Sequence, residues 1–519
     1  MGKAAPLLVI ALSVLAYSNA QRGPFVFDDL PAIVENELLP PEGLRECLTA
    51  PPGSTASGRP LVALSFALNH ALSGMEVSSW RATNLLLHTL TALALLALAR
   101  ATLASAGREG RAATVIALLW SAHPLLTDAV NLVASRSELL VSLAYLCVLL
   151  CLMKCAEAPR PWSALCVLAC CLGMASKEVM LSAPLIALAW DRTFLTGSWR
   201  AAWRARRGLY MWLAASWLIL LACILTGDRG ASVTLGADAV SPLRSLLTQA
   251  GAITHYISLT FWPTELSIDY ADWPIARGMD EVLPELCLIS SLLALAIWRV
   301  RAKHPDGLLL LTLFALLAPS SSVIPLTGEL VAEHRMYLAS ASLIALTVLA
   351  TERLFARTGL VFLCLILTPL LHSLTMARNE EWASARTIWE RATEVRPTNA
   401  RAWNSLGVAL EAEGLQAAAA DAWREALAHD PDDYRAHSNL GEHYAGLNEG
   451  ARAISHLQSA VSLRPDHLEL RFNLGTLLLR SGDPAGAEMQ LSEALQRAQS
   501  DWELREIAER RLARARAQR

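Results

Sequence analysis

The chain has 519 residues, of which 54% are apolar and only 18% are charged, and its formal net charge is −3. Soluble globular proteins usually carry about 25% charged residues, so this composition argues against one large soluble enzyme and favours a membrane protein. The near-neutral balance, without a long basic block, also argues against a nucleic-acid partner. The charges are unevenly spread: 38 of them fall in the 139 residues from Glu381 onward. An apolar first three-quarters therefore precedes a charged last quarter.

The apolar part contains twelve candidates for membrane-spanning helices, because a span needs roughly 20 mostly apolar residues. They are Pro6–Ala20, 82–104, 112–127, 138–155, 162–175, 179–193, 209–226, 246–262, 283–298, 308–326, 336–350 and 359–375. We interpret the first as an uncleaved helix with a cytoplasmic N-terminus, since many further spans follow it.

The basic loops between these segments all fall on one side only if segment 246–262 does not cross the membrane. That segment is short and is interrupted by Gly, His, Tyr and Thr, so we interpret it as a re-entrant or interfacial element. About eleven spans remain. The odd number predicts that the charged last quarter lies on the outer side, in the ER lumen or the bacterial periplasm.

The first outer loop, residues 21–80, begins with the string FVFDDLPAIVEN, from Phe25 to Asn36. Asp28 and Asp29 are adjacent in it, so their carboxylates repel, and one pKa should rise while the other group stays ionised. Such a carboxylate can accept a proton from a hydroxyl nucleophile. It can equally bind a cation or cap a helix, and the residues alone leave these alternatives open.

Basic residues also stand at the outer ends of apolar segments. The candidates are Arg136, Lys177, His334 and Arg335. His334 and Arg335 oppose the positive-inside trend and therefore call for an explanation. The alternatives are ordinary: Arg136 can snorkel to the interface, and Lys177 can pair with its neighbour Glu178.

The charged last quarter repeats with a period of 34 residues. The repeated positions are Pro397, Pro431 and Pro465; Gly407, Gly441 and Gly475; and Ala426, Ala460 and Ala494. This is the pattern of the tetratricopeptide repeat, a helix pair in which small residues let the helices approach closely. A solenoid of such pairs presents a concave surface that binds proteins or peptides, although a passive stalk is the alternative.

The sequence thus predicts an all-α protein, a polytopic membrane helix bundle followed by an α-solenoid. We expect a membrane domain over 1–378, a half repeat over 379–398, three full repeats over 399–499 and a polar capping helix over 500–519. The residues leave three functions open: an enzyme, a membrane-anchored scaffold for envelope or lumenal protein assembly, and a transporter or flippase. A transporter would favour charges deep within its helices, whereas the candidates here cluster at span ends.

The ordered set of loop motifs resembles one family. Besides the Asp28-Asp29 string, the motifs are RPLVALSFALNHAL (Arg59–Leu72), HPLLTDAVNLVASRSELL (His123–Leu140), SKE (Ser176–Glu178), FWPTELSIDY (Phe261–Tyr270) and AEHRMYLAS (Ala332–Ser340). Together with the repeats, they resemble the transmembrane and tetratricopeptide-repeat (TMTC) protein O-mannosyltransferases. These are relatives of the dolichyl-phosphate-mannose-dependent O-mannosyltransferases, of the GT-C class.

The resemblance implies a GT-C-type membrane enzyme that takes a sugar from a polyprenyl- or dolichyl-phosphate donor. The sugar, expected to be mannose, is transferred with inversion to a Ser or Thr hydroxyl of an acceptor protein, which the repeats would bind. In that class an acid of the first outer loop is the general base. The resemblance therefore assigns this role to Asp28 or Asp29, and we favour Asp29.

The lipid phosphate that leaves carries negative charge, so cations should stand beside it. The expected phosphate ligands are Arg136, Lys177, His334 and Arg335, with support from His123, Asp128, Glu138, Glu178 and Tyr337. Two carboxylates could hold a divalent ion, but no third ligand is evident, so no metal site is predicted.

The chain departs from the family pattern in three ways. Ala339 stands where a proline is expected, only three full repeats are present, and no N-x-[S/T] sequon occurs. With the Ala- and Arg-rich composition, these departures favour a bacterial relative in the inner membrane over an ER protein. The lipid carrier would then be a polyprenol other than dolichol.

Overall fold

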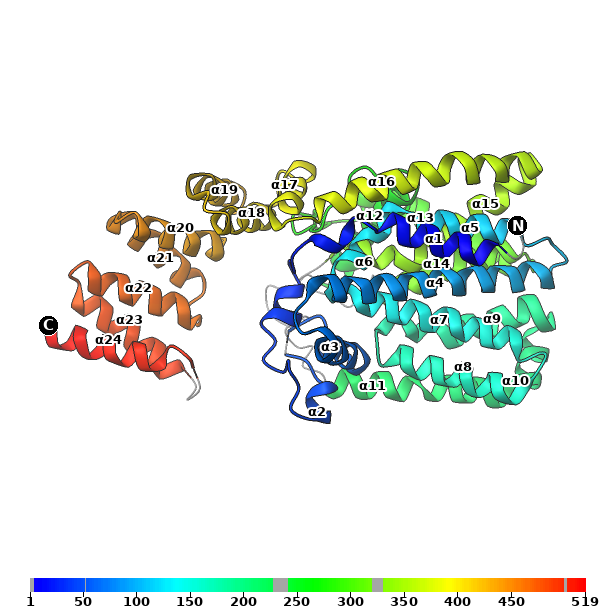
Figure 1. The fold of residues 1–519 in the computed structure, drawn as a ribbon, viewed down its shortest axis with the longest axis horizontal. Helices are drawn as coiled ribbons and strands as arrows, with labels where there is room; N and C mark the ends of the chain where they lie inside the picture. Colours follow the sequence, from blue (N-terminus) through cyan, green and yellow to red (C-terminus); the bar gives the residue numbers. More distant parts are fainter. Residues whose placement is uncertain (1–3, 52, 227–240, 320–329, 499–501) are drawn as a thin grey trace. The chain divides into compact units, whose positions relative to one another are not determined.

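The computed structural model describes residues 4–51, 53–226, 241–319, 330–498 and 502–519. Within these ranges every regular element is helical, which confirms the expected all-α class. Two compact units are present, Met1–Ala385 and Arg386–Arg519 (Figure 1). Residues 320–326 of the expected span 308–326 and residues 500–501 of the expected capping helix lie outside the described ranges.

The first unit is a bundle in which long helices run side by side, with α2 and α3 gathered at one end (Figure 1). Its helices are α1 (Ala5–Ala16), α2 (Leu44–Cys47), α3 (Pro60–Ser73), α4 (Val77–Ser105), α5 (Arg111–Ser121), α6 (Thr127–Asn131), α7 (Arg136–Lys154), α8 (Pro159–Met174), α9 (Ala183–Asp191), α10 (Trp199–Ala215), α11 (Trp217–Thr226), α12 (Pro242–Phe261), α13 (Leu283–Arg301), α14 (Pro305–Leu317), α15 (Met336–Phe362) and α16 (Thr368–Glu381). Short helical turns that matter for the site are η2 (Leu30–Val34), η5 (Glu178–Ser182) and η8 (Glu333–Arg335). The apolar core includes side chains of α1, α4, α5, α7 and α15.

Five helical segments are long and apolar enough to cross a membrane, or six if one bent pair counts as a span. The five are Val77–Ser105, Val133–Lys154, Trp199–Thr226, Asp280–Arg301 and Glu333–Glu381, and the pair Arg111–Ser121 and Pro124–Asn131 is bent by 56°. The expected count of about eleven is therefore not confirmed. Helices do occupy the other predicted positions, but they are short: α1 has 12 residues, α8 has 16 and α9 has 9.

Two details of the span pattern follow the sequence closely. Segment Glu333–Glu381 has 49 residues, roughly 75 Å of helix, which is too long for one crossing of a hydrocarbon core about 30 Å thick. Ala356, with a φ of +49°, interrupts it between the two predicted spans 336–350 and 359–375. Helix α12 has 20 residues but is not among the five apolar segments, in line with the interruptions noted in its sequence.

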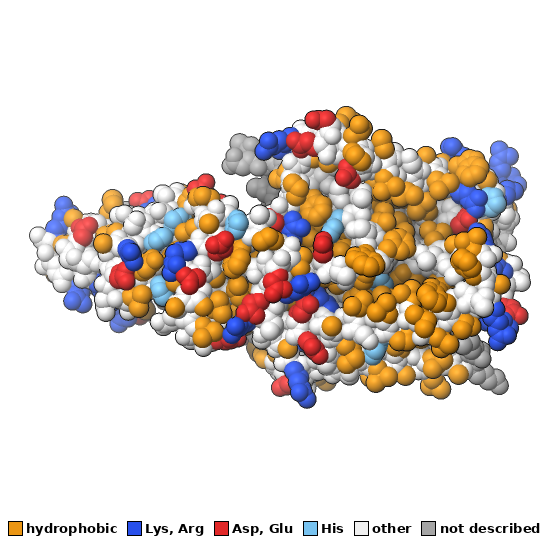
Figure 2. Space-filling view, turned by 90° about the horizontal axis from the view of Figure 1, so that it is seen from above, with side chains coloured by type: hydrophobic (Ala, Val, Ile, Leu, Met, Phe, Trp, Pro, Cys, Tyr) orange, Lys and Arg blue, Asp and Glu red, His pale blue; other side chains and the backbone are white. Residues whose placement is uncertain are grey.

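Large apolar side chains cover much of the outer surface of this bundle (Figure 2). Among them, Leu225 is 76% exposed and Trp298 is 59% exposed, and only 6% of the most apolar stretch of α13 is buried. Exposed apolar patches of this extent are unfavourable in water and mark a surface that contacts lipid or another protein. The bundle thus has the surface of a membrane protein.

The second unit consists of antiparallel helix pairs. Its helices are α17 (Ala385–Val395), α18 (Ala400–Ala412), α19 (Gln416–His429), α20 (Tyr434–Gly446), α21 (Gly450–Leu463), α22 (Leu468–Arg480), α23 (Pro484–Arg497) and α24 (Arg505–Gln518). The repeated glycines stand where the helices of a pair touch. A Cβ atom on Gly407 would overlap the Trp423 indole ring, and one on Gly441 would lie 2.7 Å from Leu457. The period of 34 therefore records close helix packing.

Candidate active site

The Asp28-Asp29 pair lies in a turn that enters η2. Phe27, directly before it, has a φ of +52°, a left-handed conformation that is costly for a bulky side chain and persists only where surrounding contacts fix it. The two carboxyl groups differ in exposure, since Asp29 is completely buried and Asp28 is half-buried. The carboxyl group of Asp28 is therefore partly accessible, whereas that of Asp29 is not.

Asp29 ties this turn to the start of α7. Its Oδ1 accepts a 2.7 Å hydrogen bond from the amide of Ala134, and its Oδ2 accepts a 3.3 Å bond from the amide of Val26. Burial raises the pKa of Asp29 from 3.8 to about 7, against the lowering effects of these two amides and of the Arg81 and Arg136 charges. Asp29 is therefore a fixed group whose charge changes near neutral pH.

Arg81, on α4, holds the chain that leads into the turn. Its guanidinium donates to the carbonyls of Ala20 at 2.5 Å and Pro24 at 3.0 Å. Gly23 packs directly against it, and a Cβ there would come within 2.5 Å of the guanidinium and would overlap the Trp382 carbonyl. The sequence offered no sign of this role, because an arginine near a span end is ordinarily a snorkelling residue.

Arg136 is completely buried, and its guanidinium is engaged by protein groups. It donates to Asn84 Oδ1 at 2.8 Å, Asn69 Oδ1 at 3.0 Å, the Trp80 carbonyl at 3.1 Å and the Ser65 carbonyl at 3.2 Å. These partners lie on α3 and α4, so Arg136 joins three helices. This geometry suits a positioning role.

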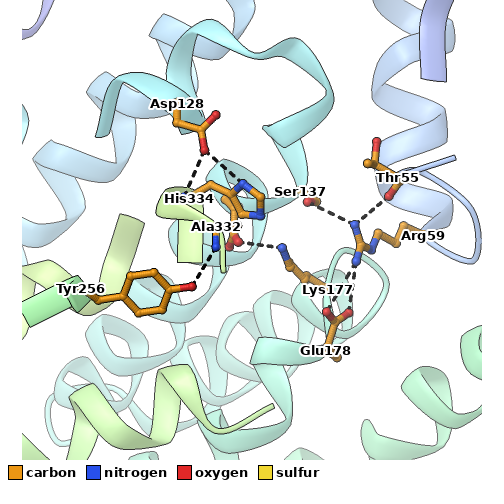
Figure 3. Close-up of polar contacts among 10 residues, drawn as sticks. Thr55, Arg59, Asp128, Ser137, Lys177, Glu178, Tyr256, Ala332 and His334 are labelled. Carbon is orange, nitrogen blue, oxygen red and sulfur yellow. Dashed lines mark hydrogen bonds and ion pairs between the residues drawn. The ribbon is translucent and has the colours of Figure 1, made fainter. Parts of the chain in front are cut away.

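Two ion pairs that join three segments of the bundle lie in the region of Figure 3. Lys177 donates to Glu138 Oε1 at 2.6 Å, and both side chains are nearly buried. Arg59 pairs with Glu178 at 3.4 Å and also donates to Ser137 Oγ at 3.5 Å. Lys177 and Glu178 are adjacent in the chain, as are Ser137 and Glu138. The two ion pairs and the Arg59–Ser137 hydrogen bond therefore form one continuous polar network. Arg59 lies in one of the loop motifs, but the sequence did not single it out.

A third contact joins α6 to η8 (Figure 3). Asp128 Oδ2 accepts a hydrogen bond from the His334 amide and faces the His334 ring Nδ1, both at 3.2 Å. The other oxygen, Asp128 Oδ1, is buried and has no hydrogen-bond partner among the described residues. Arg335 donates to the Leu330 carbonyl at 2.9 Å. Two of the basic residues expected from the sequence, Lys177 and His334, thus lie in this region, and each is paired with an acid.

The comparisons with known proteins agree with this architecture. Family models described as tetratricopeptide repeat match residues 374–433, 417–466 and 448–506. Human protein O-mannosyl-transferase TMTC3 is 25% identical over 457 residues, which cover 78% of this chain and 49% of that protein. Protein O-mannosyl-transferase F38B6.6 of Caenorhabditis elegans is 26% identical over 432 residues (79% and 60% coverage), and mouse TMTC1 is 36% identical over 152 residues (27% and 16% coverage). The chain is thus similar to the TMTC proteins over most of its length. It spans about half the length of human and mouse TMTC3.

Two residues expected to support the donor site instead make contacts inside the bundle. The Tyr337 hydroxyl lies 2.9 Å from His88 Nδ1, and its carbonyl accepts from the Trp120 indole at 2.9 Å. His123 bonds through Nε2 to the Thr260 carbonyl at 2.9 Å and accepts from the Leu125 amide. Both side chains thus connect separate segments of the bundle.

One buried acid near His334 was not predicted from the sequence. Glu333 is 1% exposed, and its Oε1 accepts from the Ser267 amide and the Tyr270 hydroxyl, both at 2.6 Å. Its Oε2 has no partner among the described residues. Glu333 could have been proposed from the sequence because it directly precedes His334 in the motif AEHRMYLAS. No group of three or more His, Cys, Asp or Glu residues in the described ranges is arranged to hold a metal ion.

Proposed function

We propose that this protein is a membrane glycosyltransferase that moves mannose from a polyprenyl- or dolichyl-phosphate donor to Ser or Thr hydroxyls of proteins on the outer side of the membrane. The observation that carries the proposal is the Asp28-Asp29 turn, fixed to the start of α7 by the 2.7 Å Ala134–Asp29 hydrogen bond. The name protein O-mannosyl-transferase of the relatives supports the reaction class.

Asp28 is the general base of the proposed reaction, because its half-buried side chain is the accessible member of the pair. Its carboxylate accepts the proton of the acceptor hydroxyl while the hydroxyl oxygen attacks the anomeric carbon of the sugar. The bond between that carbon and the phosphate oxygen breaks, and polyprenyl phosphate leaves with the electron pair. Attack opposite the leaving group inverts the anomeric centre.

Asp29 positions this base. From the sequence we favoured Asp29 as the base, and its complete burial shifts that preference to Asp28. Asp29 is completely buried and each of its oxygens accepts from a backbone amide, so an external hydroxyl cannot approach it unless the turn opens. Its effect on transfer is therefore expected to run through the conformation of the turn.

The leaving phosphate in this proposal lies beside Lys177, His334 and Arg335, which stand at the outer ends of their segments. Lys177 and His334 are each held by a carboxylate, Glu138 and Asp128 respectively. Such pairing fixes the basic side chain in place before the substrate arrives. It therefore stabilises the negative charge that develops on the leaving phosphate in the transition state. Arg136 contributes by holding α3, α4 and α7 in register.

The repeat unit is proposed to bind the acceptor protein, since solenoids of helix pairs present extended concave surfaces. A second candidate function, a membrane-anchored scaffold without activity, accounts for the repeats and the bundle. It gives no reason for a strained turn that fixes two adjacent carboxyl groups, and we therefore place it second.

The test uses the full chain in detergent with radiolabelled polyprenyl-phosphate mannose and a Ser/Thr-rich acceptor protein. We expect transfer by the wild type and at least a hundredfold loss in Asp28→Asn, with Glu37→Gln, an exposed acid of the same loop, as the matched control. A parallel reaction with GDP-mannose tests the donor class. Equal labelling by wild type and Asp28→Asn would remove the catalytic assignment, and transfer from GDP-mannose alone would remove the lipid donor. Deleting 400–519 should reduce protein transfer more than donor hydrolysis.

A further inference from the structure

Two adjoining cavities lie between α8 and α10, at the end of the bundle away from α2 and α3 (Figure 1). The first, of about 490 Å³, is lined by Arg204, Arg206 and Arg207 together with residues of the loop before α8. The second, of about 620 Å³, is lined mainly by apolar side chains, among them Val167, Leu168 and Trp212. Both include Ser163, Gly208 and Leu209 in their walls, so they form one continuous groove.

The basic end of this groove is built by a break in α10. Arg206 has φ −137° and ψ +31°, which interrupts the helix. Its guanidinium donates to Asp191 at 2.7 Å, and Asp191, completely buried, also accepts from the Tyr210 hydroxyl. The charge of Arg206 is thus compensated within the protein, and the residue serves as the anchor of the break.

Arg204 and Arg207 flank this anchor and are exposed. Neither has a hydrogen-bond or ion-pair partner among the residues that the structure describes. Two uncompensated positive charges therefore stand at the mouth of the groove. Lys and Arg side chains also gather at this end of the bundle (Figure 2), as expected for the cytoplasmic side of a membrane protein.

The other end of the groove runs along apolar, outward-facing helix surface. Leu168 is 53% exposed and Trp212 is 67% exposed, so this part opens toward the surroundings of the bundle. A ligand that fits both ends needs an anionic group at one end and an apolar chain at the other. Free nucleotides and inorganic anions lack the chain, and neutral lipids lack the charge.

We propose that the α8–α10 groove binds an anionic phospholipid of the inner leaflet. Its phosphate lies between Arg204 and Arg207, and one acyl chain lies along Val167, Leu168 and Trp212. Basic pockets between helices at the cytoplasmic side are suited to anionic headgroups because Arg donates to phosphate in a fixed fork geometry. The lipid would bridge α8 and α10 beside the break at Arg206.

The experiment measures lipid binding by native mass spectrometry of the full chain, with dioctanoyl phosphatidylglycerol and dioctanoyl phosphatidylcholine as probes. We expect phosphatidylglycerol to bind at least tenfold more tightly. Arg204→Gln/Arg207→Gln should weaken its binding about tenfold. The control Arg200→Gln/Arg301→Gln removes the same charge from exposed arginines that do not line the groove and should change binding less than twofold.

A second variant blocks the groove without removing charge. A Cβ on Gly208 meets nothing within 4 Å, so Gly208→Phe should fold normally, fill the shared wall and abolish phosphatidylglycerol binding. Equal binding of the two lipids, equal binding by the arginine variant and its control, or no effect of Gly208→Phe would each overturn the proposal. Equally tight binding of glycerol 1-phosphate would also overturn it and indicate a soluble-anion site. No sugar donor is used, and Asp28→Asn should bind the lipid like wild type, so this test stands apart from transfer activity.

Discussion

The amide of Ala134 donates a 2.7 Å hydrogen bond to the carboxyl group of Asp29, which lies 105 residues earlier in the chain. This contact links the turn after α1 to the segment that begins α7, and it does so beside the strained residue Phe27. The position of Asp28 therefore depends on a distant part of the sequence. The proposed base and the helix that carries Arg136 are parts of one rigid arrangement.

Asp29 should make the stability of the protein depend on pH. Its pKa rises from 3.8 to about 7 on folding because burial disfavours the charge. The folded state therefore holds the proton more tightly, and the stabilisation present below pH 4 is lost as the pH rises through 7. We expect Tm in detergent to fall between pH 5 and 8, and this fall to be smaller in Asp29→Asn. A pH slope identical in both proteins would contradict the prediction.

Arg136 should be required for folding more than for donor affinity. Its removal leaves Asn69, Asn84 and the Trp80 carbonyl without their donor inside the bundle, which costs roughly 3–5 kcal/mol. Arg136→Gln should therefore lower Tm strongly, and Arg136→Lys should recover only part of it because Lys lacks the fork of donors. Arg22→Gln, at an exposed arginine, is the control. If Arg136→Gln left Tm unchanged and raised the KM for the donor, Arg136 would instead bind the donor phosphate, as the sequence led us to expect.

The sequence predicted the helical class and the 34-residue repeat, because these depend on local apolarity and on fixed spacing. It could not predict the partners of Arg136, since Asn69 and Asn84 become neighbours only when α3 and α4 pack together. The span count of about eleven is not confirmed. Apolar composition marks where a helix lies, but a break such as the one at Ala356, or a short helix such as α9, depends on tertiary contacts.

The Lys177–Glu138 pair should show strong coupling. Because both side chains are nearly buried, removing one leaves the other charge without compensation, at a cost of about 3–5 kcal/mol, whereas removing both costs much less. Lys177→Met and Glu138→Gln should each lower Tm more than the double variant does. The exposed pair Lys154–Glu157 is the control and should show coupling below about 1 kcal/mol. Additive effects at the buried pair would indicate that the two groups do not interact.

Two histidines of the repeat unit should weaken it at acidic pH. His437 Nδ1 and His456 Nδ1 lie 3.0 Å apart, and His437 Nε2 faces the Pro431 carbonyl at 3.1 Å, so only one proton fits between the rings. Burial first, and then the nearby His437 and Arg452 charges, lower the pKa of His456. The lowered pKa implies that stability is retained above pH 6.5 and lost as the pH falls below it.

Hydrogen exchange of the full chain, corrected for intrinsic rates, measures this effect. Protection of α20 and α21 should fall between pH 7 and 5, while protection of α18 changes little. In His456→Asn the side-chain amide keeps a donor for His437 and cannot be protonated, so the loss should be reduced. Equal loss in both proteins would assign the pH dependence to another group.

The repeated glycines should tolerate no side chain. A Cβ on Gly441 would lie 2.7 Å from Leu457 Cγ and 3.4 Å from the Ala453 carbonyl, so Gly441→Val forces α20 and α21 apart at a cost of roughly 1–3 kcal/mol. A Cβ on Gly446, at the end of the same helix, would meet nothing within 4 Å, and Gly446→Ala should be neutral or slightly stabilising because alanine favours helix. Hydrogen exchange of the full chain should show lost protection across α20 and α21 in Gly441→Val alone. Unchanged protection in that variant would mean that the 34-residue glycine period does not reflect helix packing.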